Sequence, residues 1–214
     1  MLMRLRTQLS LISAGLLLGF LSPGYAMVPM EMQHVRQAIV YGMEHGGETR
    51  HAIMADNWIE GSEGSLLLVY SPFMMIASEV ARGNTYDLPP TEKAIKETKA
   101  KHWRTIRNFV EGSQPVQVKF TLSCYGTDPA FMKTARAVLT GEGRGQSVVL
   151  KPTKTYCQPD GEKLNTGTGQ VMYEAMGAFY FPLEKLLALD EMTLTVRFAD
   201  GRELAFPMRP KHLY

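Results

Sequence analysis

The sequence predicts an α+β fold in which N-terminal helices pack on a mostly antiparallel, β-sandwich-like sheet. Two observations lead to this prediction. Through residues 27–112, apolar residues recur every three to four positions, which is typical of helices that bury one face. From residue 113 onward, apolar and polar residues alternate in short segments separated by turns, which is typical of antiparallel strands. We expect the parts 27–112 and 113–214 to form one compact domain, with two loosely joined units as the alternative.

The segment that precedes these parts predicts export. Residues 1–26 contain two arginines, then the apolar run Leu9–Leu21, then the small residues Gly24 and Ala26. This order is that of a secretory signal peptide, and the run is shorter than the about 20 apolar residues of a membrane span. We therefore expect the mature protein to begin at Met27 and to work in the periplasm or outside the cell. No second long apolar run follows, so we expect no transmembrane span after signal removal.

The charge balance argues against nucleic acid as a partner. The formal net charge is +2, and the predicted leader carries two arginines and no acidic residue, so we expect a neutral mature chain. Binding to nucleic acid depends on an excess of cations that neutralise phosphates. The segment Gly141–Gly145 does not predict phosphate binding either, because strands are expected on both sides of it, whereas phosphate-binding loops precede a helix. We expect a hairpin tip there and no cofactor.

Three helices and one strand are expected before residue 113. In the first helix Met32, Val35 and Ile39 share one face, and Gly46-Gly47 ends it. The apolar segment Ser65–Tyr70 has no helical period, which predicts a strand buried on both faces.

Capping residues predict where the other two helices begin. Ser71 is the expected N-cap of the second helix and Pro72 its first residue, and Gly83-Asn84 ends that helix. Thr91 is the expected cap of a third helix that runs to about Glu111. Its basic side chains lie opposite its apolar face, as in a solvated helix. The alternative is contact with an anionic membrane surface through a set of cations: Lys96, Arg104 and Arg107.

Residues 113–214 predict short strands joined by turns. The expected strands are Val116–Cys124, Ala135–Thr140, Gln146–Leu150, Tyr173–Phe181 and Met192–Phe198. A short helix, Leu183–Leu189, is expected between the last two of them.

The last hairpin can be predicted in register. A three-residue turn, Ala199–Gly201, with a left-handed glycine places apolar residues opposite one another. The expected pairs are Val196 with Leu204, Leu194 with Phe206 and Met192 with Met208. The same register places Arg197 opposite Glu203 on the outer face, where opposite charges stabilise the pairing.

The two cysteines, Cys124 and Cys157, predict a disulfide, because exported proteins meet an oxidising environment. In the chain-entropy model such a bridge would stabilise the fold by about 3–4 kcal/mol. The alternative is a pair of free thiols that behave as small apolar side chains.

Two segments are candidate functional sites. The first comprises carboxylates, an aromatic ring and nearby histidines: Asp56, Trp58, Glu60, His45 and His51. These side chains could line a groove for a sugar or peptide, or residues 56–63 could serve a hydrolase together with a histidine. The second comprises thioethers and an imidazole at the expected new N-terminus: Met27, Met30, Met32 and His34. Thioethers select Cu(I), although methionine also serves as adaptable core filling.

No nucleophile–base pair, zinc spacing or nucleotide loop stands out in the sequence. We therefore expect an exported, non-enzymatic protein that binds a protein or small-molecule partner in the cell envelope or outside the cell. A secreted hydrolase and a Cu(I) carrier are the alternatives.

Overall fold

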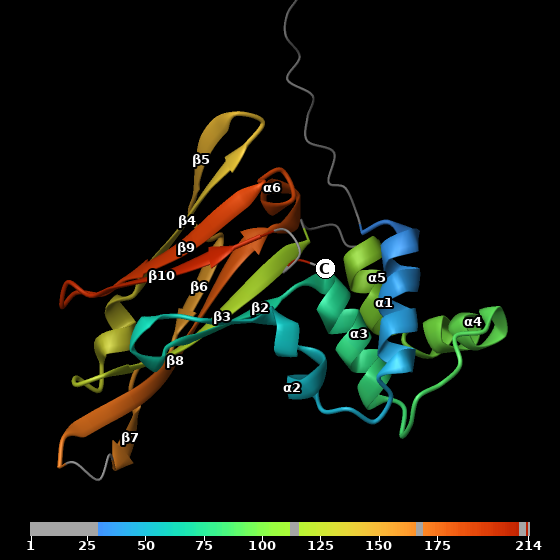
Figure 1. Cartoon of the computed structure of the whole chain (residues 1–214), viewed down its shortest axis with the longest axis horizontal. Helices are drawn as coiled ribbons and strands as arrows, with labels where there is room; N and C mark the ends of the chain where they lie inside the picture. Colours follow the sequence, from blue (N-terminus) through green and yellow to red (C-terminus); the bar gives the residue numbers. More distant parts are fainter. Residues whose placement is uncertain (1–29, 112–115, 166–168, 210–212, 214) are drawn as a thin grey trace, which may run out of the picture.

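The computed structural model describes residues 30–111, 116–165, 169–209 and 213 (Figure 1). The predicted leader and Met27 lie outside the described residues, so export stays a prediction. Helices gather at one end of the molecule and two β-sheets at the other (Figure 1). Within the described ranges, no helix is long and apolar enough to cross a lipid bilayer.

The helical layer is built on the contact between α1 (Met32–Glu44) and α3 (Pro72–Arg82). Gly42 of α1 lies directly on α3, where an added Cβ would meet the carbonyl oxygen of Ala77 at 2.4 Å. The helices approach this closely because glycine has no side chain. A buried face of α1 was predicted and is confirmed by five residues: Val35, Ala38, Ile39, Gly42 and Met43.

Helix α3 begins as predicted. The Oγ of Ser71 accepts a hydrogen bond from the backbone N–H of Met74 at 3.2 Å, and Pro72 occupies the first turn. The cap satisfies a donor that the helix itself leaves without a partner. Ser71 is fully buried, so it acts as a cap within the fold.

The predicted third helix is in fact two helices, α4 (Glu92–Lys101) and α5 (Trp103–Val110), which meet at His102. Thr91 caps α4 as predicted, because its Oγ1 accepts a hydrogen bond from the N–H of Ala94 at 3.3 Å. The break turns the chain, so that α4 contacts α1 and α5 contacts α3. Each short helix thereby buries its own apolar side chains.

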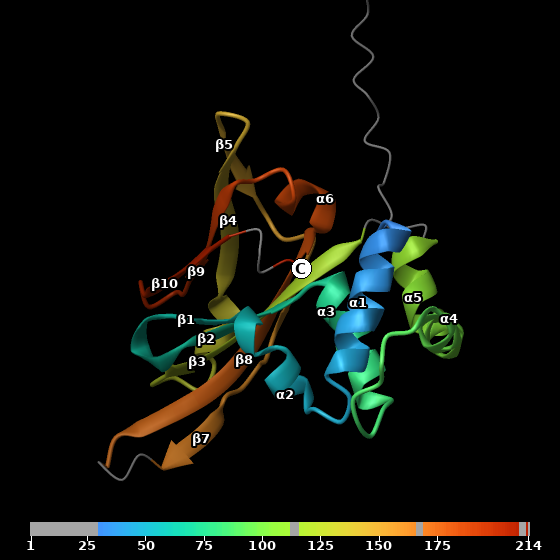
Figure 2. The ribbon, with the colours of Figure 1, turned by 45° about the vertical axis from the view of Figure 1, so that its right-hand side comes forward.

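Two antiparallel sheets form the other end of the molecule (Figure 2). The first has the strand order β1-β2-β3-β8-β6, with β7 also paired to β8. Its strands are β1 (Trp58–Glu60), β2 (Leu66–Tyr70), β3 (Gln117–Gly126), β8 (Val171–Pro182), β6 (Lys154–Cys157) and β7 (Glu162–Asn165). The second has the order β10-β9-β4-β5. Its strands are β10 (Glu203–Met208), β9 (Glu191–Arg197), β4 (Arg136–Gly143) and β5 (Gln146–Leu150).

The main core lies between these sheets. Every second residue of β3 points into it, as the alternation predicted, and Val118, Phe120 and Leu122 are fully buried. The helices enclose a separate core around Ile39 and Ile106. The predicted α+β fold with a sandwich-like sheet is therefore confirmed. The N-terminal half supplies β1 to the sheet as well as β2, the strand predicted there.

The register of the last hairpin is confirmed. Val196 pairs with Leu204, Leu194 with Phe206 and Met192 with Met208. Arg197 lies opposite Glu203, and its Nε donates to the carboxylate at 2.6 Å. Gly201 has φ +88°, the left-handed conformation that the turn requires.

The predicted disulfide is wrong: Cys124 and Cys157 are both free. Cys124 lies on β3 opposite Ala175, and Cys157 lies on β6 opposite Gly177, so that β8 separates them. Adjacent strands lie about 4.8 Å apart, which places strands on either side of a third about 9.5 Å apart. A disulfide requires Cα atoms within about 7 Å of each other. The alternative prediction of two free thiols therefore holds.

Candidate functional site

A cleft of about 300 Å³ lies where the helical layer meets the sandwich. Its walls come from five separate segments of the chain. The lining residues are Met30, Glu31, His34, Pro72, Phe73, Arg144, Leu183, Glu184, Leu187, Ala188 and Leu213. Seven of these eleven side chains are apolar or proline, and the other four are ionisable. Small-molecule sites have this composition, with an apolar lining and a few polar groups that fix orientation.

The helical wall of the cleft is held by backbone contacts. The N–H of Met30 donates to the carbonyl of Phe109 at 3.2 Å, which ties the start of α1 to the end of α5. His34 lies in the first turn of α1. The capped start of α3 places Phe73 against the same space. Two helix starts therefore define this wall.

The opposite wall is the connection between β8 and β9, which contains α6 (Leu183–Leu186). The N–H of Leu183 donates to the carbonyl of Val116 at 2.8 Å, which anchors the start of α6 beside β3. Leu186 faces the sandwich core and is fully buried. Leu187 is 42% exposed and lines the cleft, although an apolar side chain of this size is usually buried.

The third side of the cleft is the turn between β4 and β5. Its two central residues, Arg144 and Gly145, have φ +52° and +75°, as in a two-residue hairpin turn. The strands therefore extend further than predicted, because the expected tip Gly141–Gly145 is reduced to two residues. Arg144 belongs to the lining of the cleft. No functional side chain was predicted in this turn.

The cleft carries charges of both signs that the described residues do not pair. Glu31, Arg144 and Glu184 form no ion pair within the described part of the chain. Glu31 comes from the helical wall, Glu184 from α6 and Arg144 from the hairpin turn. These groups can therefore interact with a ligand in the cleft.

The predicted thioether site is brought together only in part. Met30, which precedes α1, and His34, in the first turn of α1, both line the cleft. Met32 is 42% exposed and does not line the cleft, so it also lies off the buried face predicted for this helix. Met27 lies outside the described residues. No group of three or more His, Cys, Asp or Glu side chains that could hold a metal occurs in the described ranges.

The predicted acidic and aromatic site lies elsewhere, on α1, the α2 region and β1. His45 ends α1, where its Nδ1 lies 2.7 Å from the carbonyl oxygen of Tyr41 and its ring stacks on the Tyr41 ring at 4.1 Å. Trp58 starts β1 and packs in a small apolar cluster, while Glu60 is exposed at the end of β1.

The remaining two members of that site, His51 and Asp56, lie in α2 (Arg50–Ile53) and in the 3₁₀ turn Ala55–Asn57. Their side chains are outside the described part. The three members with described side chains, His45, Trp58 and Glu60, do not line the cleft. A hydrolase at residues 56–63 stays a prediction.

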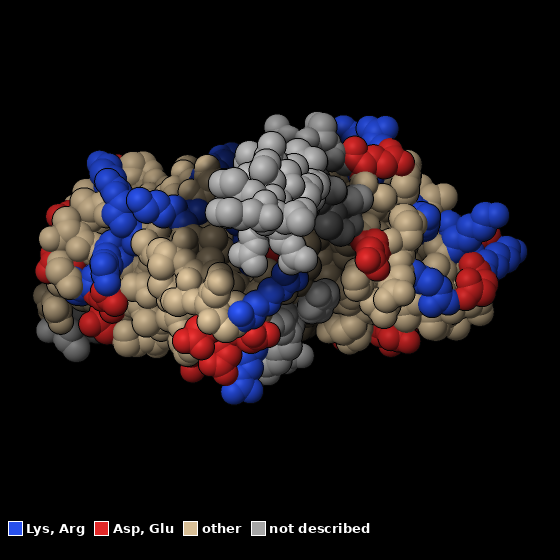
Figure 3. Space-filling model, turned by 90° about the horizontal axis from the view of Figure 1, so that it is seen from above, with Lys and Arg blue, Asp and Glu red and all other residues tan. Residues whose placement is uncertain are grey.

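The basic side of the predicted third helix is exposed. Lys96, Arg104 and Arg107 all face solvent. Acidic residues lie among the cations at the helical end, on the right in Figure 3. One of them, Glu92, forms an ion pair with Arg36. Contact of this face with an anionic membrane stays a prediction.

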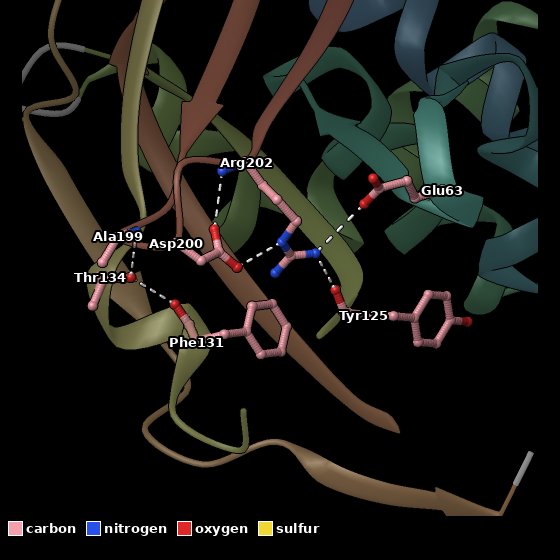
Figure 4. Close-up of polar contacts among 7 residues, drawn as sticks. All are labelled: Glu63, Tyr125, Phe131, Thr134, Ala199, Asp200 and Arg202. Carbon is pink, nitrogen blue, oxygen red and sulfur yellow. Dashed lines mark hydrogen bonds and ion pairs between the residues drawn. The ribbon is translucent and has the colours of Figure 1, made fainter. Parts of the chain in front are cut away.

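A second polar cluster surrounds Arg202, at the end of the sandwich away from the helices (Figure 4). The guanidinium donates to the carbonyl of Tyr125 at 2.7 Å and to the carboxylate of Asp200 at 2.7 Å, and it lies 3.5 Å from the carboxylate of Glu63. Unlike Arg144, Arg202 thus has its hydrogen-bond and ion-pair partners within the described part of the fold. Arg202 therefore joins the β9–β10 turn to the first sheet, and this cluster is structural.

Comparison with known proteins adds no assignment, since no family model, curated protein or solved structure matches the chain. Function must therefore be argued from the site itself. The cleft is the strongest candidate, because it combines an apolar lining with ionisable groups. Sequence reasoning missed most of it, including Phe73, Arg144 and Leu187, and found only Met30 and His34.

Proposed function

We propose that this chain is an exported, non-catalytic protein that binds a small, largely apolar ligand in the cleft between α1, α3 and α6. The observation that carries the proposal is the composition of the cleft: a volume of about 300 Å³, a mainly apolar lining, and ionisable groups on three sides. Burial of apolar ligand surface would supply the affinity, at about 25 cal/mol per Å² removed from water. Export follows from the leader-like residues 1–26.

The lining supports a binding role. Seven of its eleven side chains are apolar or proline, and such a lining contributes affinity when a ligand covers it. The exposed side chain of Leu187 supports a binding role as well, since a ligand would cover it.

An uncharged apolar dye, Nile red, tests this proposal directly. The full chain should bind one equivalent of the dye with an increase in fluorescence. Leu187→Arg should weaken this binding at least tenfold, about 1.4 kcal/mol, because it places a charge in the apolar lining. Val149→Arg is the matched control, because Val149 is a 65% exposed apolar residue on β5 outside the cleft.

Dye binding that is absent, or that Leu187→Arg leaves unchanged, would exclude the cleft as the binding site. An equal loss in both variants would have the same meaning, because the loss would then come from any added arginine.

Cu(I) binding is a second candidate, and one observation favours it: Met30 and His34 line the same cleft. A thioether and an imidazole are suitable ligands for this ion. Competition of the protein with a chromophoric Cu(I) chelator tests it, with Met30→Leu as the variant and Met75→Leu, an exposed methionine of α3, as the control. A site weaker than about micromolar, or a site that Met30→Leu does not affect, would end this candidate.

A further inference from the structure

The turn at Arg144 has a backbone conformation that arginine adopts only at a cost. Its φ of +52° lies in the left-handed region, and Glu63 is the only other described non-glycine residue with positive φ. Two-residue hairpin turns of this kind favour asparagine, aspartate or glycine at their first position, because those residues tolerate the conformation. An unfavourable backbone conformation that persists next to a cleft points to a function of the side chain.

The guanidinium of Arg144 is free to serve a ligand. Among the described residues it takes part in no ion pair or hydrogen bond, and the residue is exposed. The guanidinium of Arg197, by contrast, binds Glu203, and that of Arg202 binds Asp200. A free guanidinium at the edge of an apolar cleft is suited to a carboxylate, which it can bind through two parallel hydrogen bonds.

The other walls present the opposite charge. Glu31 and Glu184 line the same cleft and form no ion pair in the described part of the chain. A purely anionic ligand would bring its charge close to these carboxylates, and a purely cationic one would lie close to Arg144. A ligand that carries both charges complements all three groups. The volume of about 300 Å³ restricts it to a small molecule.

We propose that the ligand is a small zwitterion with an apolar body, which is the chemistry of an apolar amino acid or dipeptide. Its carboxylate binds Arg144, its ammonium group binds Glu31 or Glu184, and its apolar side chains contact Phe73, Leu183 and Leu187. This inference rests on the proposed function, because it names the ligand class of the same cleft.

Displacement of Nile red from the full chain tests the inference. Leucine and leucyl-leucine are the zwitterionic probes, and the difference between them reports the size of the ligand. N-acetyl-leucyl-leucine and leucyl-leucine amide each lack one charge. At least one zwitterion should displace the dye, and loss of either charge should weaken displacement about tenfold or more.

A variant assigns the carboxylate to Arg144. Arg144→Gln should weaken leucyl-leucine about tenfold and leave the affinity of its amide unchanged, since the amide has no carboxylate to lose. Lys151→Gln, which removes an exposed cation just after β5, should change neither. Equal loss for both ligands in Arg144→Gln would overturn the assignment.

Nile red binding distinguishes a wrong ligand class from a wrong binding site. If Nile red binds in a manner sensitive to Leu187→Arg but no zwitterion displaces it, the ligand class is wrong and the cleft remains a binding site. If the dye does not bind the cleft at all, the proposed function itself is wrong.

The Tm of an Arg144 variant gives a second readout, which distinguishes a functional role of Arg144 from a structural one. Arg144→Asn replaces arginine by a residue that favours the left-handed conformation, so it should raise the Tm by about 2 °C while it weakens leucyl-leucine. A lower Tm would mean that Arg144 serves the fold, and would overturn the functional interpretation of its conformation.

Discussion

Gly143 lies directly against the backbone of Ala188: a Cβ added to the glycine would be 2.1 Å from the carbonyl oxygen of Ala188. No side chain fits in that distance. Because Gly143 has none, the α6–β9 connection can lie directly on the β4–β5 turn. A second contact holds the same place, because the N–H of Asp190 donates to the carbonyl of Glu142 at 2.7 Å. This approach sets the distance between the turn and α6, the two sides of the cleft that belong to the sandwich.

We predict that Gly143→Ala lowers both stability and ligand binding. The methyl group forces the backbone of Ala188 away, and such overpacking costs about 1–3 kcal/mol. Urea unfolding measures the first effect and Nile red titration the second. Ser147→Ala, on the paired strand β5, is the control and should change neither by more than about 0.5 kcal/mol. A Gly143→Ala protein as stable as the wild type would show that this contact is not tight.

We predict that Arg202 contributes far more to stability than Arg197. Besides its hydrogen bonds, the guanidinium of Arg202 lies 5.4 Å from the ring centre of Phe131 and 5.0 Å from that of Phe198. Its side chain is 27% exposed, whereas that of Arg197 is 70% exposed and pairs with Glu203 at the surface. Cation–π contacts and part-buried charged hydrogen bonds stabilise more than exposed ion pairs do.

Urea unfolding of two alanine variants checks this. Arg202→Ala should cost about 2 kcal/mol. Arg197→Ala should cost about 0.5 kcal/mol or less. Equal losses would show that the Arg202 cluster does not hold the β9–β10 turn to the first sheet.

The pH dependence of stability should include a step from His102. Its Nε2 is buried and has no hydrogen-bond partner among the described residues. Burial lowers the pKa of His102 below its ordinary 6.5, Lys101 and Arg82 lower the pKa further, and Glu79 opposes them. The folded state therefore resists protonation more than the unfolded state does.

The sign of the step follows from this difference. The contribution of neutral His102 is complete above pH 6.5 and is lost as the pH falls from there through the lower folded-state pKa. Wild-type protein should therefore lose more stability between pH 7.5 and 5 than His102→Gln does. His45→Gln serves as the control. A His102→Gln variant with the pH profile of the wild type would contradict this.

Both cysteines should react with a thiol reagent as free thiols, and the reaction should be slow in the native protein. Burial raises the pKa of Cys124 to about 12 and also raises that of Cys157. The thiolate is the reactive form, so the native protein should react slowly with Ellman's reagent. Denatured protein should react at once, and two equivalents of thionitrobenzoate should be released from the reagent per chain. The mass should not change on reduction. A mass that rises on reduction would show a bridge, and would require β8 to move from between the two cysteines.

Local patterns predicted the elements that depend on local chemistry. The register of β9–β10 followed from the alternation of Leu194 and Val196 and from a glycine that tolerates the left-handed turn. The strands β6 and β7 were missed, because each has only four residues and no apolar alternation. They exist because β8 is long enough to pair with both of them along one edge. Such pairing is tertiary, so no local signal reports it.

The cleft could not be predicted for the same reason. Phe73, Leu183 and Leu187 look like ordinary core residues, and only the fold brings the three together. The disulfide prediction was wrong because an expected oxidising environment favours pairing of cysteines but does not bring their Cα atoms within bonding distance. One signal was available and was missed: an arginine before Gly145, where a two-residue turn favours asparagine.

Hydrogen–deuterium exchange of the full chain with and without saturating Nile red tests the central claim most directly. Ligand in the cleft should slow exchange in both walls at once, in peptides that cover residues 30–36 and 183–189, and leave β10 unchanged. Slower exchange in the segment around Trp58, or no change in either wall, would contradict a binding site between the helices and the sandwich.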